Sequence, residues 1–155
     1  MKIQTTRFGE VEVEDTRVID FPKGLLGFSK YRRYVLIESG DSTRPHEDST
    51  FWWLQSVDLP ELAFVVTDPT LFVSTYKVPI HAEQMQALGL NSIDDAQVFV
   101  IVNKRDQVLT GNLQGPLVVN VGSRCGEQLV LSDRRFTTRV PLMDVRTPVP
   151  QAIPA

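Results

Sequence analysis

The sequence has one cysteine, no long apolar run and no excess of basic residues, and each shortage excludes a class of protein. The single cysteine, Cys125, excludes an internal disulfide and is typical of a reducing compartment. No apolar run approaches the roughly 20 residues needed to span a bilayer, and residues 1–7 lack the apolar core of a signal peptide. We therefore expect a cytoplasmic protein without a membrane segment.

The charge balance argues against direct contact with nucleic acid. Lys and Arg number 16 against 19 Asp and Glu, a formal net charge of −3, whereas proteins that grip phosphate backbones usually show a clear basic excess. A mildly acidic chain suits a basic protein partner, which complementary charge would steer. The length of 155 residues, with 42% hydrophobic and 23% charged content, fits one globular domain with a real core.

Motifs of the common enzyme classes are also missing. The chain has no G-x-S-x-G, no G-x-x-x-x-G-K-[ST] and no G-x-G-x-x-G. A metal site would need His46, His81, Cys125 and carboxylates, which lack ligand spacing. Adjacent Asp94 and Asp95 are more typical of a turn than of an acid–base pair. We predict no enzymatic activity, cofactor, metal or small-molecule substrate.

Two short runs of aromatic and β-branched residues, 51–57 and 63–67, form the centre of the predicted fold. The Pro-containing segment between them predicts a turn joining two antiparallel strands. Because successive side chains of a strand point to opposite faces, Trp52 and Trp53 face opposite sides. Covering both faces places this pair in the middle of the fold. Alternatively, Trp52 is partly exposed and anchors a partner.

Further segments have strand character. Residues 10–14 alternate strictly between polar and apolar, which indicates a half-buried strand, and residues 97–103 are nearly all apolar, as in a strand covered on both faces. The other predicted strands are residues 3–8, 17–21, 34–38, 117–121 and 128–131. About eight short strands joined by turns predict an all-β, mainly antiparallel fold, a small β-barrel-like domain.

One short helix, one long loop and a tail complete the prediction. Residues 79–88 predict the helix, with a proline at its start and a glycine after its end. Residues 39–50 contain no aliphatic or aromatic side chain and predict a mobile surface loop. We assign residues 1–143 to a single domain and residues 144–155 to a Pro-rich, disordered C-terminal tail.

Two surfaces are candidates for binding. Glu10, Glu12 and Glu14 occupy alternate positions of one strand, so they form an acidic ribbon with a spacing of about 7 Å. The ribbon is either a solvated face that discourages edge pairing or a docking strip for a basic partner. The apolar loop 24–28, hinged by two glycines, either tucks under the domain or presents a binding surface.

Three stretches resemble the FliW family of flagellar assembly factors. F-W-W-L-Q-S-V-D at residues 51–58, followed by L-A-F-V at 62–65, resembles its W-L-Q-S-v-d … A-F-v-v segment. N-L-Q-G-P-L-V-V-N at 112–120 resembles its N-L-x-A-P-I-V-I-N run, and F-P-K-G-L-L-G-F at 21–28 its F-P-x-G-i-p-G-F loop. Weaker similarities at 6–9, 126–131 and 139–142 extend the resemblance over roughly residues 5–142.

The resemblance implies a small, β-barrel-like cytoplasmic protein with no enzymatic activity. Such factors bind newly made flagellin and alternatively bind CsrA, a basic RNA-binding translational repressor. Bound CsrA no longer silences flagellin mRNA, and secretion of flagellin frees the factor. Flagellin supply is thereby coupled to export.

The chemistry of these partners predicts where they bind. CsrA must be positively charged to hold RNA, so the acidic ribbon is its predicted contact. Flagellin presents amphipathic termini that need an apolar surface. The predicted partner-binding residues are Glu10, Glu12, Glu14, Leu25, Leu26, Phe28, Trp52, Phe72 and Tyr76.

Two positions depart from the family pattern. Gly115 stands where the family usually has alanine. Lys77 follows Tyr76 where family members tend to carry acidic residues, so this chain is expected to bind CsrA differently or to bind flagellin alone.

Two other functional classes stay open. One is an OB-like nucleic-acid-binding domain that uses Lys30, Arg32, Arg33 and nearby tyrosines. The other is an enzyme built on the barrel, with His81 or Cys125 beside a carboxylate in a pocket.

Overall fold

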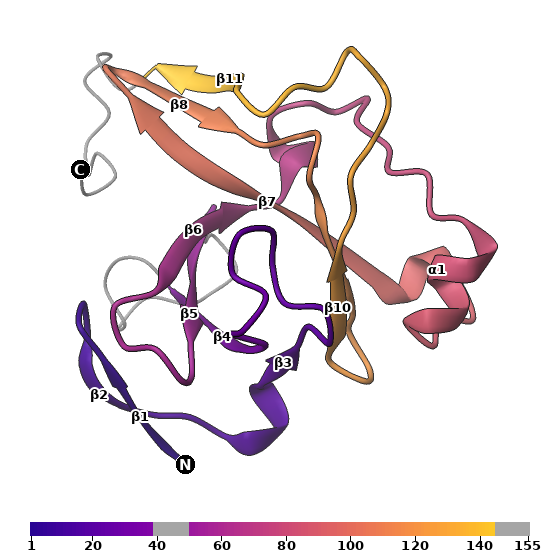
Figure 1. Cartoon of the computed structure of the whole chain (residues 1–155). Helices are drawn as coiled ribbons and strands as arrows, with labels where there is room; N and C mark the ends of the chain where they lie inside the picture. Colours follow the sequence, from indigo (N-terminus) through magenta and orange to yellow (C-terminus); the bar gives the residue numbers. More distant parts are fainter. Residues whose placement is uncertain (39–49, 145–155) are drawn as a thin grey trace.

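The structure is a computed structural model that describes residues 1–38 and 50–144. Short strands joined by turns make up most of it (Figure 1). The strands are β1 (Lys2–Thr5), β2 (Gly9–Glu12), β3 (Ile19–Asp20), β4 (Arg33–Glu38), β5 (Phe51–Ser56), β6 (Ala63–Thr67), β7 (Ala96–Arg105), β8 (Val108–Gly111), β9 (Leu117–Asn120), β10 (Cys125–Gln128) and β11 (Val140–Asp144). The helices are α1 (Ala82–Ala87) and the 3-10 turns η1 (Asp15–Arg17), η3 (Pro69–Leu71) and η4 (Ile93–Asp95).

Part of the main sheet closes on itself. The order β7-β6-β5-β4-β3-β10-β9 returns to β7, because the start of β7 pairs with β9 and its later residues pair with β6. These pairs are antiparallel except β3–β10, where one residue pair, Asp20 and Cys125, closes the ring in parallel. β8 and β11 extend the sheet beyond the ring, and β1 and β2 form a separate hairpin (Figure 1). The predicted all-β, mainly antiparallel, barrel-like fold with one short helix is confirmed, with an uneven ring.

The predicted central pair of strands is confirmed. β5 and β6 pair antiparallel from Phe51↔Thr67 to Gln55↔Ala63, in the middle of the nine-stranded sheet. The Trp52 ring packs edge-on against Phe99, with centroids 6.0 Å apart. Trp53 is covered by Arg7 and Phe8 from the turn between β1 and β2, with the Arg7 guanidinium 4.0 Å from its ring centroid and the Phe8 ring edge-on at 6.1 Å. Both faces of β5 are therefore covered, as the alternation of side chains requires.

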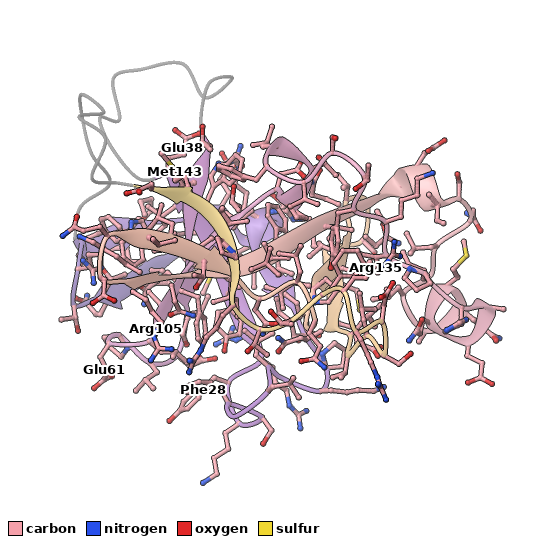
Figure 2. The ribbon with its side chains drawn as sticks, turned by 90° about the horizontal axis from the view of Figure 1, so that it is seen from above. Phe28, Glu38, Glu61, Arg105, Arg135 and Met143 are labelled. Atoms are coloured by element: carbon pink, nitrogen blue, oxygen red, sulfur yellow. The ribbon has the colours of Figure 1, made fainter. Side chains whose placement is uncertain are left out.

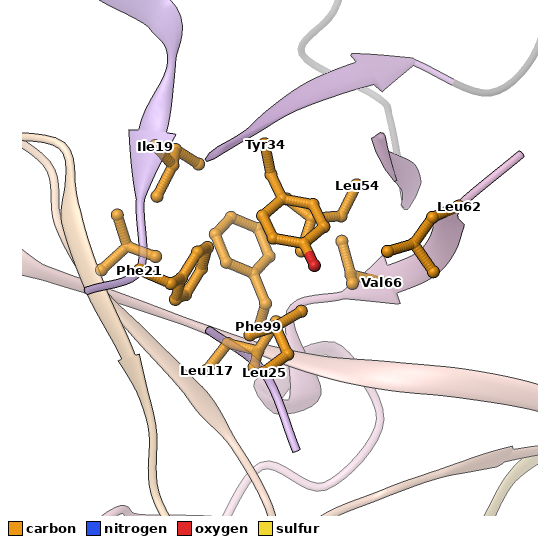
Figure 3. Packing of buried hydrophobic residues seen from close by; sticks show 10 residues of the cluster. Ile19, Phe21, Leu25, Tyr34, Leu54, Leu62, Val66, Phe99 and Leu117 are labelled. Atoms are coloured by element: carbon orange, nitrogen blue, oxygen red, sulfur yellow. The ribbon is translucent and has the colours of Figure 1, made fainter. Parts of the chain in front are cut away.

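The core inside the ring draws side chains from strands far apart in the sequence (Figure 3). Tyr34 of β4 is fully buried, and its ring meets Phe21 edge-on at 5.7 Å. The buried members are Ile19, Phe21, Leu25, Tyr34, Leu54, Leu62, Val66, Phe99, Leu117 and Val119. Burying large apolar side chains stabilises a fold by about 1.5–3 kcal/mol each, so this cluster anchors the strands around it.

The helix is shorter than predicted. It begins at Ala82, not at Pro79, because His81 is its N-cap and the His81 backbone N–H donates to Gln84 Oε1 at 2.8 Å. The chain leaves the helix through Gly89, whose φ of 68° is left-handed. α1 adjoins a second core cluster on the opposite side of β7 from the ring interior.

One strand near the C-terminus is displaced from its predicted position. β10 covers Cys125–Gln128, whereas residues 128–131 were predicted to be the strand. The apolar side chains of Leu129 and Leu131 are buried, but their backbone N–H groups bond to Pro116 and Gln114 outside any strand. The strand therefore begins at Cys125 and ends before these two leucines.

The last strand lies at a sheet edge. β11 pairs only with β8 among the described strands and carries Pro141 next to a register shift between Pro141 and Met143. Proline is tolerated at an edge or a bulge because it lacks an N–H for the ladder. Asp144, assigned to the tail, belongs to this strand. Residues 145–155, and residues 39–49 of the loop predicted at 39–50, lie outside the described residues.

Candidate partner-binding surfaces

Two glycines set the shape of the apolar loop. Gly24 and Gly27 have φ values of 66° and 83°, the left-handed region that only glycine adopts without strain. A Cβ on Gly24 would lie 2.6 Å from the Cα of Ser29, so no other residue fits there. The Leu26 backbone N–H also donates to Gln128 Oε1 at 2.9 Å, which ties the loop to β10.

The loop divides its three apolar side chains between core and solvent. Leu25 is 2% exposed and packs inside the ring, whereas Leu26 is 59% and Phe28 37% exposed. The Phe28 ring meets Phe64 edge-on at 5.4 Å, and Figure 2 shows Phe28 projecting at one side of the molecule. Leu25 therefore tucks under the domain, whereas Leu26 and Phe28 are exposed, as a binding surface would require. We call Leu26 and Phe28 the loop pair.

The residues around the loop pair bear on the nucleic-acid alternative. Lys30 and Arg32 are exposed, but Arg33 forms a bidentate contact with Asp58, and both groups of this ion pair are about half exposed. Tyr34 is fully buried in the core. The cluster therefore offers fewer free cations and stacking rings than its sequence indicates.

The acidic ribbon is exposed as predicted, but two of its charges are partly compensated. Glu10 lies 3.8 Å from the Lys2 ammonium and accepts a hydrogen bond from Gln4 Nε2 at 3.0 Å. Glu12 lies 3.8 Å from the N-terminal ammonium and pairs across the hairpin with Lys2. Glu14 follows the end of β2 and has no ion pair within the described part of the chain.

Tyr76, predicted to touch a partner, is a core residue. It is 4% exposed, its ring meets Phe136 edge-on at 4.8 Å, and its hydroxyl donates to the Leu113 carbonyl at 2.7 Å. Burial raises the pKa of Tyr76 well above its usual value of 10.0. Direct contact through this side chain is incompatible with the observed conformation, although Lys77 beside it is exposed.

Phe72 also faces inward more than expected. It is half-buried and packs on Phe51 at 5.8 Å, while the preceding Leu71 is 57% exposed. The turn η3 explains why Leu71 is exposed and Phe72 is not: Asp68 caps the turn, and the turn directs Leu71 outward. The sequence analysis did not predict the exposure of Leu71. The signal for it is Asp68-Pro69, a pair typical of the start of a helical turn.

Trp52 is half-buried and lines a surface cleft of about 390 Å3. Its ring therefore belongs to the core on one side and reaches solvent on the other. Trp52 is therefore a core residue that is partly exposed, and its role as an anchor for a partner stays a prediction.

The structure offers few residues for metal or acid–base chemistry. No group of three or more His, Cys, Asp or Glu residues that could hold a metal occurs within residues 1–38 and 50–144, and His46 lies outside them. Burial, together with the charges of Asp20 and Glu127, raises the pKa of the Cys125 thiol, which opposes nucleophilic reactivity. Neither Cys125 nor His81 lines the described clefts of about 340 and 390 Å3. Among the described helices, none is long and apolar enough to cross a membrane.

Comparison with known proteins places the chain in one family. The family model described as FliW protein matches residues 2–142. Curated relatives include the flagellar assembly factor FliW of Natranaerobius thermophilus, 37% identical over 93% of both chains, and that of Geobacter sulfurreducens, 40% identical over 93% of this chain and 87% of the relative. A crystal structure of the flagellar assembly factor FliW matches with a TM-score of 0.79 and 30% identity, over 92% of this chain and 97% of that one. The chain therefore belongs to the FliW family of flagellar assembly factors.

Proposed function

We propose that this protein binds flagellin in the cytoplasm and alternatively binds and antagonises the repressor CsrA, without catalysing a reaction. Flagellin synthesis would then follow export, because secretion of flagellin frees the factor to sequester CsrA. Family membership supports the role in flagellar assembly. The two partners come from the resemblance and are matched here to particular surfaces.

The loop pair is the observation that carries the flagellin half of the proposal. Exposed Leu26 and Phe28 sit on a loop whose backbone is fixed by two glycines and by the Leu26–Gln128 hydrogen bond. A rigid apolar surface loses little conformational entropy on binding, and an amphipathic segment docks through such anchors. Phe28 also rests on Phe64, which holds its ring in place.

The acidic ribbon supports the CsrA half. Its carboxylates would attract a basic partner and repel RNA phosphates held nearby. Because Lys2 offsets Glu10 and the N-terminal ammonium offsets Glu12 and Asp15, Glu14 carries more of the field. The side chain of Tyr76 is no longer part of the proposed contact, whereas exposed Lys77 would oppose a basic partner at its own position.

Affinity capture of the tagged full chain from its own cytoplasm, with bound proteins identified by mass, tests the proposal. We expect flagellin, CsrA or both from the wild-type chain. A Leu26→Ser/Phe28→Ala variant should lose flagellin but keep CsrA, whereas the control Ile93→Ser, which changes a side chain with 56% exposure elsewhere, should keep both. Recovery of neither protein would overturn the proposal, and retained RNA would favour the nucleic-acid alternative.

A further inference from the structure

A mixed apolar and basic cleft opens beside β3, the shortest strand of the ring. β3 pairs with β4 through only two residue pairs, Ile19↔Tyr34 and Asp20↔Arg33. Beside this short strand lies the cleft of about 390 Å3, between η1, β4, β5 and the turn from β9 to β10. Its main lining residues are Arg17, Leu36, Glu38, Trp52, Val121 and Arg124.

The apolar part of the cleft can receive one large side chain. Trp52 and Leu36 are half-buried against the ring core, and Val121 at the rim is 52% exposed. A pocket of 300–1,000 Å3 accommodates a small ligand, so about 390 Å3 suits one aromatic or branched side chain with its backbone. Burying such a side chain would also cover the exposed part of Val121.

Two arginines meet at one side of the cleft. Arg124 Nη2 donates to the backbone carbonyl of Arg17 at 3.0 Å, which brings two guanidinium-bearing residues together in a chain with a net charge of −3. Arg124 Nε is buried and has no hydrogen-bond partner among the described residues. Burial first, and then the charge of Arg17, lower the pKa of Arg124. An anion placed beside the two guanidinium groups would relieve this repulsion.

The backbone of Arg124 adds a separate indication. Its φ is 63°, in the left-handed region that side-chain-bearing residues rarely occupy. Glycine would remove this strain, yet the position carries a long cationic side chain. Strained residues of this kind are concentrated at binding and active sites.

From this geometry we infer that the cleft binds a segment of a partner polypeptide in which an aromatic or branched apolar side chain is followed by a carboxylate. The apolar side chain lies on Trp52, and the carboxylate lies between Arg17 and Arg124. This site is separate from the loop pair: Figure 2 shows Glu38 and Phe28 at opposite sides of the molecule.

A polypeptide fits the cleft better than a nucleic acid does. Single-stranded nucleic acid needs a basic groove that follows several phosphates, with aromatic rings for successive bases. This cleft offers one tryptophan and two arginines. The inference does not depend on which protein is the partner, so its test is independent of flagellin binding and of CsrA binding.

The probe is the dipeptide Ac-Phe-Asp-NH2, titrated into 15N-labelled full-length protein to about 10 mM. We expect the indole N–H signal of Trp52 and the amides of Val121 and Gly122 to shift, with a Kd of about 1 mM. The isosteric Ac-Phe-Asn-NH2 should bind about tenfold more weakly, because it loses the charge-assisted hydrogen bonds. This comparison uses only the wild-type chain and is independent of any folding defect.

Variants then test whether the two cleft arginines bind the carboxylate of the peptide. Arg124→Gln and Arg17→Gln should each weaken binding of the aspartate peptide by about tenfold. Arg105→Gln, which removes an exposed arginine at the end of β7, is the control and should change nothing. A melting temperature for each variant shows that it is folded.

Three results would overturn the inference. They are no shift at Trp52, equal binding of the aspartate and asparagine peptides, and unchanged binding in both cleft arginine variants. Tighter binding of a single-stranded oligonucleotide at the same signals, weakening steeply with salt, would replace the polypeptide by a nucleic acid.

Discussion

The ring of Phe28 stands edge-on to the ring of Phe64, with centroids 5.4 Å apart and planes at 75°. Phe64 belongs to the central strand β6, so a solvent-exposed loop residue is braced directly against the middle of the sheet. The loop holds this position through the left-handed backbone of Gly24 and Gly27. The proposed binding surface and the stability of the fold therefore depend on the same glycines.

Replacing each loop glycine by alanine should give two different losses of stability. Gly27→Ala places a Cβ in open space and costs only the strain of a left-handed backbone, about 1 kcal/mol. Gly24→Ala adds a clash with the Ser29 backbone and should lower the free energy of unfolding by about 2 kcal/mol or more. Urea denaturation measures both. Equal losses would show that the loop backbone moves freely.

The two buried tyrosines, Tyr76 and Tyr34, differ in their hydrogen bonding, so substitution of one is a control for substitution of the other. Tyr76→Phe removes the hydrogen bond to the Leu113 carbonyl and should cost about 1–2 kcal/mol of unfolding free energy. Tyr34→Phe should be neutral or stabilising, because the Tyr34 hydroxyl has no hydrogen-bond partner among the described residues. Thermal and urea unfolding separate the two. A Tyr76→Phe chain of normal stability that binds a partner poorly would return Tyr76 to the binding surface.

Alkaline solution should destabilise the fold through the same tyrosines. Burial raises the pKa of Tyr34 from 10.0 to about 12 and raises that of Tyr76 as well. Above pH 10 the unfolded chain loses protons that the folded chain keeps, so unfolding becomes more favourable as pH rises toward 12. Tyr34→Phe should reduce this loss of unfolding free energy by on the order of 2 kcal/mol near pH 12. Identical pH profiles of both chains would contradict this assignment.

Much of the central sheet could be predicted from local sequence patterns, whereas the burial or exposure of several candidate site residues could not. The β5–β6 hairpin and the buried β7 follow from runs of aromatic and β-branched residues around a proline turn. Tyr76 lies among Ser, Thr and Lys and looks exposed; its burial comes from Leu113 and Phe136, which are distant in sequence. Register and long-range packing of this kind leave no local signal.

The same limit applies to the strand near the C-terminus and to the cleft. Residues 128–131 have the apolar content of a strand, but the ladder forms over Cys125–Gln128, where β10 must meet both β3 and β9. Arg17 and Arg124 are 107 positions apart and meet only because that ladder closes the ring. Exposure of Leu26 beside buried Leu25 likewise depends on the backbone direction set by the loop glycines.

Charge reversal on the acidic ribbon should weaken CsrA binding in a graded way. Glu14→Lys, at the position without an ion pair among the described residues, should have the largest effect, about tenfold at low salt. Glu10→Lys and Glu12→Lys should have smaller effects, because Lys2 and the N-terminal ammonium already offset these carboxylates. Titration calorimetry at two salt concentrations measures the series. Unchanged affinity in all three variants would remove the ribbon from the CsrA contact.

The most direct test of the account is the affinity of the purified chain for monomeric flagellin, measured by calorimetry for wild type, Leu26→Ser/Phe28→Ala and Ile93→Ser. Truncating two central apolar anchors should raise the Kd by at least about tenfold, while Ile93→Ser, matched in exposure to Leu26, should bind like wild type. All three chains should unfold at similar urea concentrations. Wild-type affinity in the loop-pair variant, or an equal loss in the Ile93→Ser control, would contradict the claim that the loop pair binds flagellin.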